Sequence, residues 1–153
     1  MNSQIVSHRQ KIDYILSEIA SVSNDEIKAH MSKYLCVLIS GYIENAVRLL
    51  LDEYVRKRSN ENVATFVSKK IKRLNNLNEN DILELLGIFS SDWAEKFSTK
   101  LTPEQKDAFD TVVANRNLIA HGASSGISYI RIKEYYPRVV QGIEIIDNII
   151  NKP

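Results

Sequence analysis

A long segment with helical periodicity, residues 25–58, constrains the fold of this chain more than any other feature. A helix that packs against a core on one side needs only one apolar stripe. This segment carries two adjacent stripes, so the sequence predicts a helix covered on two sides, either by other helices of the same chain or by a second subunit. The first stripe is Met31, Leu35, Leu38, Tyr42 and Leu49, and the second is Ile39, Ile43, Val47, Leu50 and Tyr54.

The segments on the N-terminal side of this helix also follow a helical pattern. Apolar residues recur at three-, four- and seven-residue steps from Gln4 to Ala20, and Ser3 is the expected cap. A polar break follows, in which Ser23 and Glu26 have the spacing of a capping box. The long helix is therefore expected to begin near residue 25.

The C-terminal half contains a strong helix start at Thr102, Pro103 and Gln105, where a cap, a first-turn proline and a capping-box partner coincide. That helix should continue to a stop at Gly122. Strand signals are nearly absent, so we predict one all-α domain over residues 1–153, a helical bundle with a C-terminal closing helix. The remaining predicted elements are helices at 81–87, 91–100 and 131–150, with Pro137 in the first or second turn of the last, a loop at 123–126 and an extended stretch at 127–130.

Composition is that of an ordinary globular domain, with 44% hydrophobic residues, 25% charged residues and a net charge of +1. The single cysteine, Cys36, allows no intrachain disulfide and fits a reducing compartment. The apolar run at residues 34–43 is too short to span a bilayer, and the first residues are polar. We expect a cytoplasmic protein without a membrane partner.

Charge is unevenly distributed along the chain. Residues 56–73 carry seven Lys or Arg and one acid, Glu61, whereas residues 79–95 carry five acids and no base. Within the basic segment, Lys69, Lys70 and Arg73 are candidates to guide an RNA backbone. A solvated helix face explains the same charges, and the sequence leaves both readings open.

The residues that suggest chemistry are Arg116, Asn117 and His121. The chain has no phosphate-binding glycine loop, no serine elbow and no pair of cysteines or histidines at metal-ligand spacing. Asn117 and His121 are four residues apart and share a helix face, which the long side chain of Arg116 can reach. Arginine can bind a phosphate and histidine can move a proton near neutral pH, although basic residues are also favoured at a helix C-terminus for electrostatic reasons.

The sequence Arg-Asn-Leu-Ile-Ala-His-Gly at residues 116–122 resembles the R-polar-x(3)-H signature of the HEPN superfamily, the higher eukaryotes and prokaryotes nucleotide-binding domains. The setting agrees, because a long apolar helix through residues 34–45 precedes it, and a Gly-Ser loop and a closing helix at 129–149 follow. The chain resembles small prokaryotic HEPN proteins of the RiboL-PSP-HEPN kind.

This resemblance implies a helical bundle that forms a homodimer, in which two motifs face each other across a composite active site that cleaves RNA without a metal or other cofactor. Arg116 would bind the phosphate, His121 would act as general acid or base, and Asn117 would orient them. One histidine per chain cannot easily serve as both acid and base, and two chains supply two. Such proteins act as toxins or phage-defence effectors restrained by an antitoxin or another regulatory partner.

Two further residues are candidates for substrate binding. Glu44 lies in the apolar helix and needs a partner if it is buried, either Arg48 nearby or Arg116 or His121 at a distance. Tyr129 follows the motif loop and can stack on a base, or pack as an ordinary tyrosine. Two other functions remain open, a non-catalytic HEPN module that binds nucleotide or protein and an adaptor bundle without a ligand.

Overall fold

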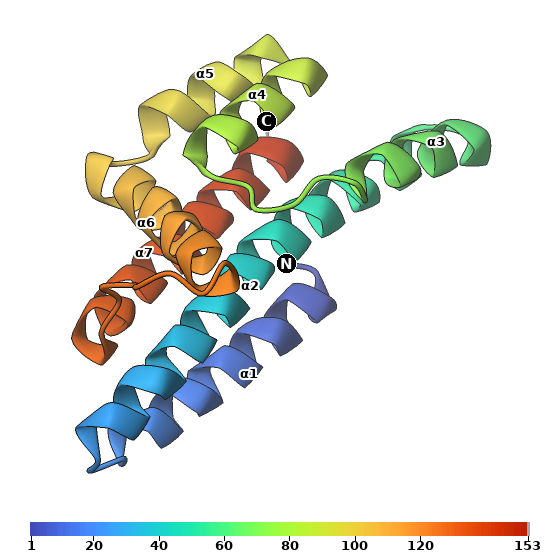
Figure 1. Ribbon diagram of the computed structural model, residues 1–153. Coiled ribbons are helices and arrows are strands. Elements are labelled where there is room, and N and C mark those ends of the chain that lie inside the picture. The colour runs from blue at the N-terminus through green and yellow to red at the C-terminus, as the bar shows by residue number, and fades with distance from the viewer. Residues whose placement is uncertain (153) are drawn as a thin grey trace.

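Helix α2 (Asp25–Arg58) runs through the centre of the molecule and contacts four other helices (Figure 1). These are α1 (Ser3–Ala20), α3 (Glu61–Ile71), α6 (Pro103–Ala120) and α7 (Tyr129–Asn151). Helices α4 (Glu79–Phe89) and α5 (Ser91–Lys100) pair with each other and contact α6 and α7, respectively. The computed structural model describes residues 1–152, which contain these seven helices and no strand, and the predicted all-α class is confirmed.

The two apolar stripes of α2 are covered within the chain. Ile39, Ile43 and Tyr42 are at most 1% exposed, and the remaining stripe residues are buried or half-buried. Neighbouring helices therefore account for the broad apolar surface that the sequence predicts, and a second subunit is not needed to explain it. By length and composition α2 would be able to cross a membrane, but 56% of its most apolar window is buried inside the protein, as expected of a central bundle helix.

Each helix begins after a residue with a short polar side chain that caps its first turn. In two helices this cap lies one residue away from the predicted one. Asn2 rather than Ser3 caps α1, and Asn24 rather than Ser23 caps α2 by accepting the backbone N–H of Ile27 at 3.0 Å. The predicted capping box at Ser23 is therefore wrong, because an adjacent asparagine, an equally good cap, takes its place. The box of Thr102 and Gln105 forms as predicted.

Helix α7 begins at Tyr129, two residues before the start at 131 that the residue pattern predicts and at the start of the closing helix of the family resemblance. Ser128 caps it with an extended backbone by accepting the backbone N–H of Arg131 at 3.3 Å, so the extended stretch expected at residues 127–130 is wrong for residues 129 and 130, which are helical. Ile127, just before the cap, is a buried residue of the loop. Because the helix starts at residue 129, Pro137 lies in its third turn, beyond the first two turns in which it was expected.

Gly142 sets how closely α6 approaches α7. A Cβ atom at this position would lie 2.3 Å from Cε2 of the fully buried Phe109, which is closer than real contacts allow. Because Gly142 has no side chain, the Phe109 ring of α6 can pack against α7 at this position. This contact holds the middle of α6 close to α7 and does not involve the C-terminal end of α6.

Candidate functional site

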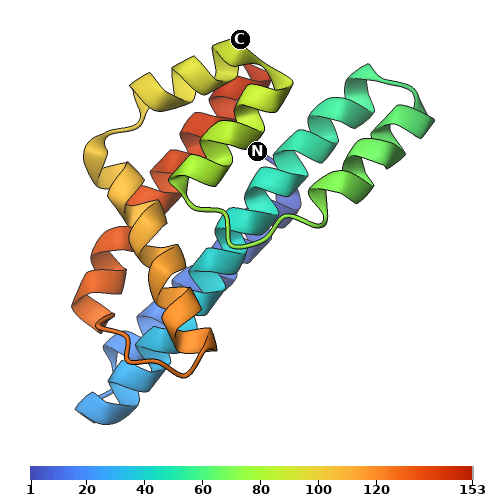
Figure 2. The same cartoon turned by 45° about the horizontal axis from the view of Figure 1, so that its top comes forward.

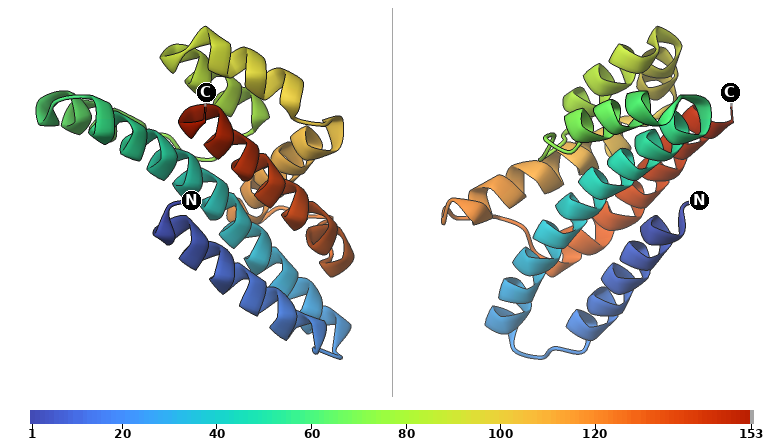
Figure 3. Two further views of the ribbon diagram at one scale, coloured as in Figure 1. Left: turned by 180° about the vertical axis from the view of Figure 1, so that it is seen from behind. Right: turned by 90° about the vertical axis from the view of Figure 1, so that its right-hand side faces the viewer.

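The motif residues occupy the C-terminal end of α6, which stands away from the neighbouring helices in the side view (Figure 3, right). His121 is the C-cap, and its backbone N–H donates to the carbonyl of Asn117 at 3.1 Å. Gly122 follows with φ +71°, a left-handed conformation that favours glycine, and Ala123 N–H donates to the carbonyl of Leu118 at 2.9 Å. The predicted stop at Gly122 is thus the turn that ends α6 beside the histidine.

Arg116 and Asn117 lie side by side at this end of α6. The Arg116 Nη1 donates to Asn117 Oδ1 at 3.4 Å, and both side chains are half-buried. Among residues 1–152 no carboxylate forms an ion pair with Arg116. Its charge is therefore not neutralised within the chain and is available to an anion. The imidazole of His121 is exposed on the same end of the helix.

A hydrogen-bonded brace, which the sequence reasoning missed, holds the loop after the motif. Ser125 Oγ donates to Asn115 Oδ1 at 2.7 Å and accepts the backbone N–H of Ile127 at 3.3 Å. Asn115 Nδ2 donates to the carbonyl of Thr111 at 2.8 Å, which fixes its amide. An amide residue just before the motif and serines just after its glycine were the available signal, and the brace makes Asn115 a positioning residue.

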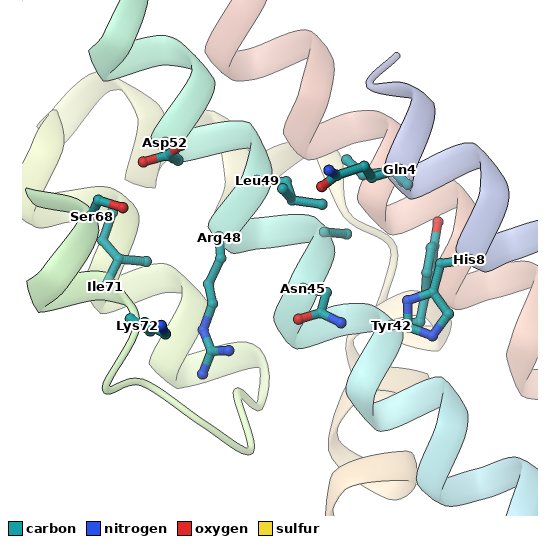
Figure 4. Close-up of a pocket in the computed structure, with 12 residues that line it drawn as sticks. Gln4, His8, Tyr42, Asn45, Arg48, Leu49, Asp52, Ser68, Ile71 and Lys72 are labelled. Carbon is teal, nitrogen blue, oxygen red and sulfur yellow. The ribbon is translucent and has the colours of Figure 1, made fainter. Parts of the chain in front are cut away.

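Glu44 has its partners near α3 and not at the motif. Its two carboxylate oxygens accept Arg48 Nη2 at 2.9 Å and the backbone N–H of Asn76 at 3.0 Å. Arg48 also donates to the carbonyl of Leu74, and Figure 4 shows its guanidinium pointing toward this loop. The local pairing of Glu44 with Arg48 is confirmed, and the pair holds the loop between α3 and α4.

A hollow of about 380 Å³ lies over α2 between α1 and α3 (Figure 4). Gln4, His8, Asn45 and Asp52 are among its polar lining residues. Three buried polar atoms without a hydrogen-bond partner, Tyr42 Oη, Arg48 Nε and Asp52 Oδ1, belong to residues that line it. Burial, and to a lesser extent Lys11, lowers the pKa of His8 below its ordinary value. Acidic, basic and neutral polar side chains all line the hollow, so its chemistry does not favour one class of ligand. None of its lining residues comes from α6.

The other predicted binding residues lie apart from the motif. Tyr129 is half-buried at the start of α7, with Lys28 Nζ 4.3 Å from its ring centroid. Lys69, Lys70 and Arg73 are exposed on and just after α3, which lies along the C-terminal part of α2 (Figure 2). The structure therefore gathers Arg116, Asn117 and His121 and does not add these cations to the same end of the bundle.

Within residues 1–152 no group of three or more His, Cys, Asp or Glu side chains is close enough to hold a metal ion. Cys36 is buried, donates its thiol to the carbonyl of Val112 at 3.4 Å, and has a pKa raised to about 12 by burial. Its thiolate form is therefore disfavoured, and Cys36 joins α2 to α6 as a core residue.

Comparison with known proteins gives one positive result. The sequence profile of the RiboL-PSP-HEPN family matches residues 3–152. No curated protein and no solved structure matches the chain significantly. The matched region spans all seven helices and includes the Arg116 to His121 motif at the end of α6. By its sequence and its all-helical fold, the chain belongs to the RiboL-PSP-HEPN family of HEPN domains.

Proposed function

We propose that this HEPN domain is a metal-independent endoribonuclease whose catalytic residues are Arg116, Asn117 and His121. One observation carries the proposal. Arg116 has no carboxylate partner among residues 1–152, is hydrogen-bonded to Asn117, and shares an exposed helix end with a histidine. A cation, an orienting amide and a proton carrier are the groups that phosphodiester cleavage requires in the absence of a metal.

The reaction transfers a phosphoryl group within the RNA strand. A neutral histidine removes the proton of the 2′-OH, and a bond forms between O2′ and the adjacent phosphorus. The bond between phosphorus and O5′ breaks, and a protonated histidine gives its proton to O5′. The products are a 2′,3′-cyclic phosphate and a 5′-OH. Arg116 stabilises the negative charge on the non-bridging oxygens, and Asn117 holds its guanidinium in place.

A homodimer supplies the two histidines that this reaction uses. The end of α6 projects from the bundle, so a second copy can approach it (Figure 3). Leu118, inside the motif, is 41% exposed. An exposed apolar side chain within a polar site is compatible with a self-complementary two-fold contact. The composite site would then contain one His121 from each protomer.

We further propose that the nuclease acts in a toxin–antitoxin or phage-defence setting in the cytoplasm, restrained by an antitoxin or another regulatory partner. An exposed site that needs no cofactor would cut cellular RNA whenever the protein is present, so restraint has to come from outside the domain. The alternative is a HEPN module that binds nucleotide or protein without cleaving RNA. Among residues 1–152 neither Arg116 nor His121 forms an ion pair with a carboxylate, and this favours catalysis over the alternative.

The test is cleavage of a single-stranded RNA oligonucleotide by purified protein in excess EDTA. We expect fragments ending in a 2′,3′-cyclic phosphate, and a rate at least about 100-fold lower for His121→Ala. The matched control is His30→Ala, which removes an exposed histidine of α2 that is 3.9 Å from Glu26. Cleavage by His121→Ala at the unaltered rate would overturn the assignment, and a monomer in light scattering at micromolar concentration would overturn the composite site.

A further inference from the structure

Helix α3 has an unusual outward face, which we define as Phe66, Lys69, Lys70 and Arg73. Lys69 and Lys70 are three and four positions from Phe66, so they share its side of the helix, and Arg73 follows in the turn just after α3. Phe66 is 62% exposed, and the three cations are exposed. The opposite side of α3 packs on α2 through the buried Ala64 and Ile71.

The phenyl ring of Phe66 is not explained by the packing of the core. The apolar side chains that α3 buries lie on its other side, and Phe66 is left largely in water. Its nearest charged neighbour is the ammonium of Lys70, with Nζ 5.5 Å from the ring centroid. A single exposed apolar side chain is common on protein surfaces, so the ring indicates a binding surface only in combination with the unpaired cations beside it.

The cations of the outward face are also unpaired. Among residues 1–152 no carboxylate lies within ion-pair distance of Lys69, Lys70 or Arg73, whereas Arg56 and Lys57, at the end of α2, are neutralised by carboxylates one turn away. Lys70 lies close to the ring, and Lys69 and Arg73 are the other unpaired cations of this face. Its helical part, from Phe66 to Lys70, spans roughly 6 Å along the helix axis.

We propose that the outward face of α3 is a binding site for single-stranded RNA, with a base stacked on Phe66 and phosphates bound by Lys69, Lys70 and Arg73. The proposal deepens the proposed function, because it takes RNA as the substrate. Stacking on an aromatic ring combined with cations along the backbone is the usual means of holding single strands without sequence preference. A protein partner fits less well, because the centre of a protein interface is apolar and depleted of charge, and here the ring lies beside Lys70 on a face with two further unpaired cations.

The site lies away from the proposed catalytic residues. Helix α3 packs along the C-terminal part of α2, while the end of α6 projects from the other part of the bundle (Figures 1 and 2). The outward face therefore anchors RNA without taking part in the reaction. Long single strands should bind more tightly than short ones, and substitutions on α3 should raise KM for long RNA while leaving kcat unchanged.

The experiment measures binding of a labelled, unstructured 20-nucleotide RNA to the His121→Ala protein by fluorescence anisotropy. Phe66→Ala should weaken binding roughly 5- to 100-fold, the range for one stacked base. Lys69→Ala with Lys70→Ala should also reduce the slope of log K against log salt by about 0.7 for each phosphate that the protein no longer neutralises. The controls are Tyr14→Ala, which removes an aromatic side chain 65% exposed on α1, and Lys11→Ala with Lys100→Ala, which removes exposed lysines elsewhere.

The outcomes separate this proposal from the proposed function. RNA binding that is unchanged in Phe66→Ala and in the double lysine variant overturns the α3 site, whether or not the protein cleaves RNA. Binding that is abolished in these variants supports the α3 site even if the wild-type protein proves unable to cleave. If the control variant Lys11→Ala with Lys100→Ala weakens RNA binding equally, the lysines of α3 act only through the net charge of the protein. This outcome also overturns the site.

Discussion

The end of α6 and the outward face of α3 both present an arginine that no carboxylate of residues 1–152 neutralises, and yet they differ in the chemistry they allow. At the end of α6, Arg116 has an asparagine beside it and a histidine five residues later, with a braced loop behind them. On α3, Arg73 is accompanied by lysines and a phenyl ring, none of which transfers protons near neutral pH. Under the proposed function, unpaired cations alone would bind a phosphate, whereas cleavage would also need a proton carrier on the same helix end.

The largest expected effect contrasts the two arginines directly. Arg116→Ala should lower kcat by about 100-fold or more, because it removes charge stabilisation that acts in the transition state. Arg73→Ala should raise KM for a long RNA by less than about 10-fold and leave kcat unchanged, because it removes one of several backbone contacts. Steady-state cleavage kinetics with a 20-nucleotide RNA measure both variants.

Arg138→Ala is the control for both, since Arg138 is an arginine of α7 that pairs with Glu134 at 2.9 Å. Equal reductions of kcat in Arg116→Ala and Arg73→Ala would remove the distinction between a catalytic and a binding region.

The second prediction concerns what holds α3 in place. Arg48 connects Glu44 of α2 to the loop that follows α3, through the carboxylate and the carbonyl of Leu74. Arg48→Ala should lower the free energy of unfolding by about 2 kcal/mol, because Glu44 loses its charged partner and the loop loses a charge-assisted hydrogen bond. It should also increase hydrogen exchange in α3 before it affects the end of α6.

Denaturant unfolding measures the stability change, and Arg138→Ala, an exposed pair on α7, should cost about 0.5 kcal/mol or less. A comparable increase of exchange at both regions after Arg48→Ala would show that they are mechanically coupled rather than independent.

The smallest expected effect concerns pH. Burial and the nearby charge of Lys11 lower the pKa of His8, so the folded protein resists protonation that the unfolded chain accepts at about pH 6.5. The unfolded state therefore binds more protons below that pH, and stability should fall slightly as the pH drops through this range. His8→Gln should flatten this dependence in thermal melts, and unaltered pH dependence would contradict it.

The same variant sharpens the comparison of the two regions. Cleavage by His8→Gln should keep the pH profile of the wild type, because His8 lines the hollow between α1 and α3 and not the end of α6. A changed profile would mean that the stability of the bundle, and not the catalytic groups, sets the pH dependence of cleavage.

Local sequence signals predicted most of the helices, because each depends on residues close in the chain. The periodicity of residues 25–58 coincides with α2, and Thr102 with Gln105 marks the start of α6. The errors are also local in origin. Asn24 competed with Ser23 for the cap, and Ser128 began α7 within the stretch that was expected to be extended.

The candidate site was predictable to the extent that it lies on one helix end. Arg116, Asn117 and His121 share that end because six consecutive residues at the end of one helix carry them all, and the family match spans them. The brace between Asn115 and Ser125 joins residues ten apart across a turn, and no periodic pattern marks it. The exposure of Phe66 was equally difficult to predict from the sequence, since an apolar residue in an amphipathic helix normally faces the core.

The sequence by itself determined most of the helices, to within a few residues at their ends, and which polar residues share the end of α6, because hydrogen bonds and side-chain spacing along one helix depend on neighbours in the chain. Only the tertiary structure decided that α2 is covered within the chain, that Glu44 belongs to the α3–α4 loop and that Phe66 faces water. These outcomes depend on which helices pack together, and a close contact such as that of Phe109 against Gly142 is set by the fit of two helix surfaces far apart in sequence.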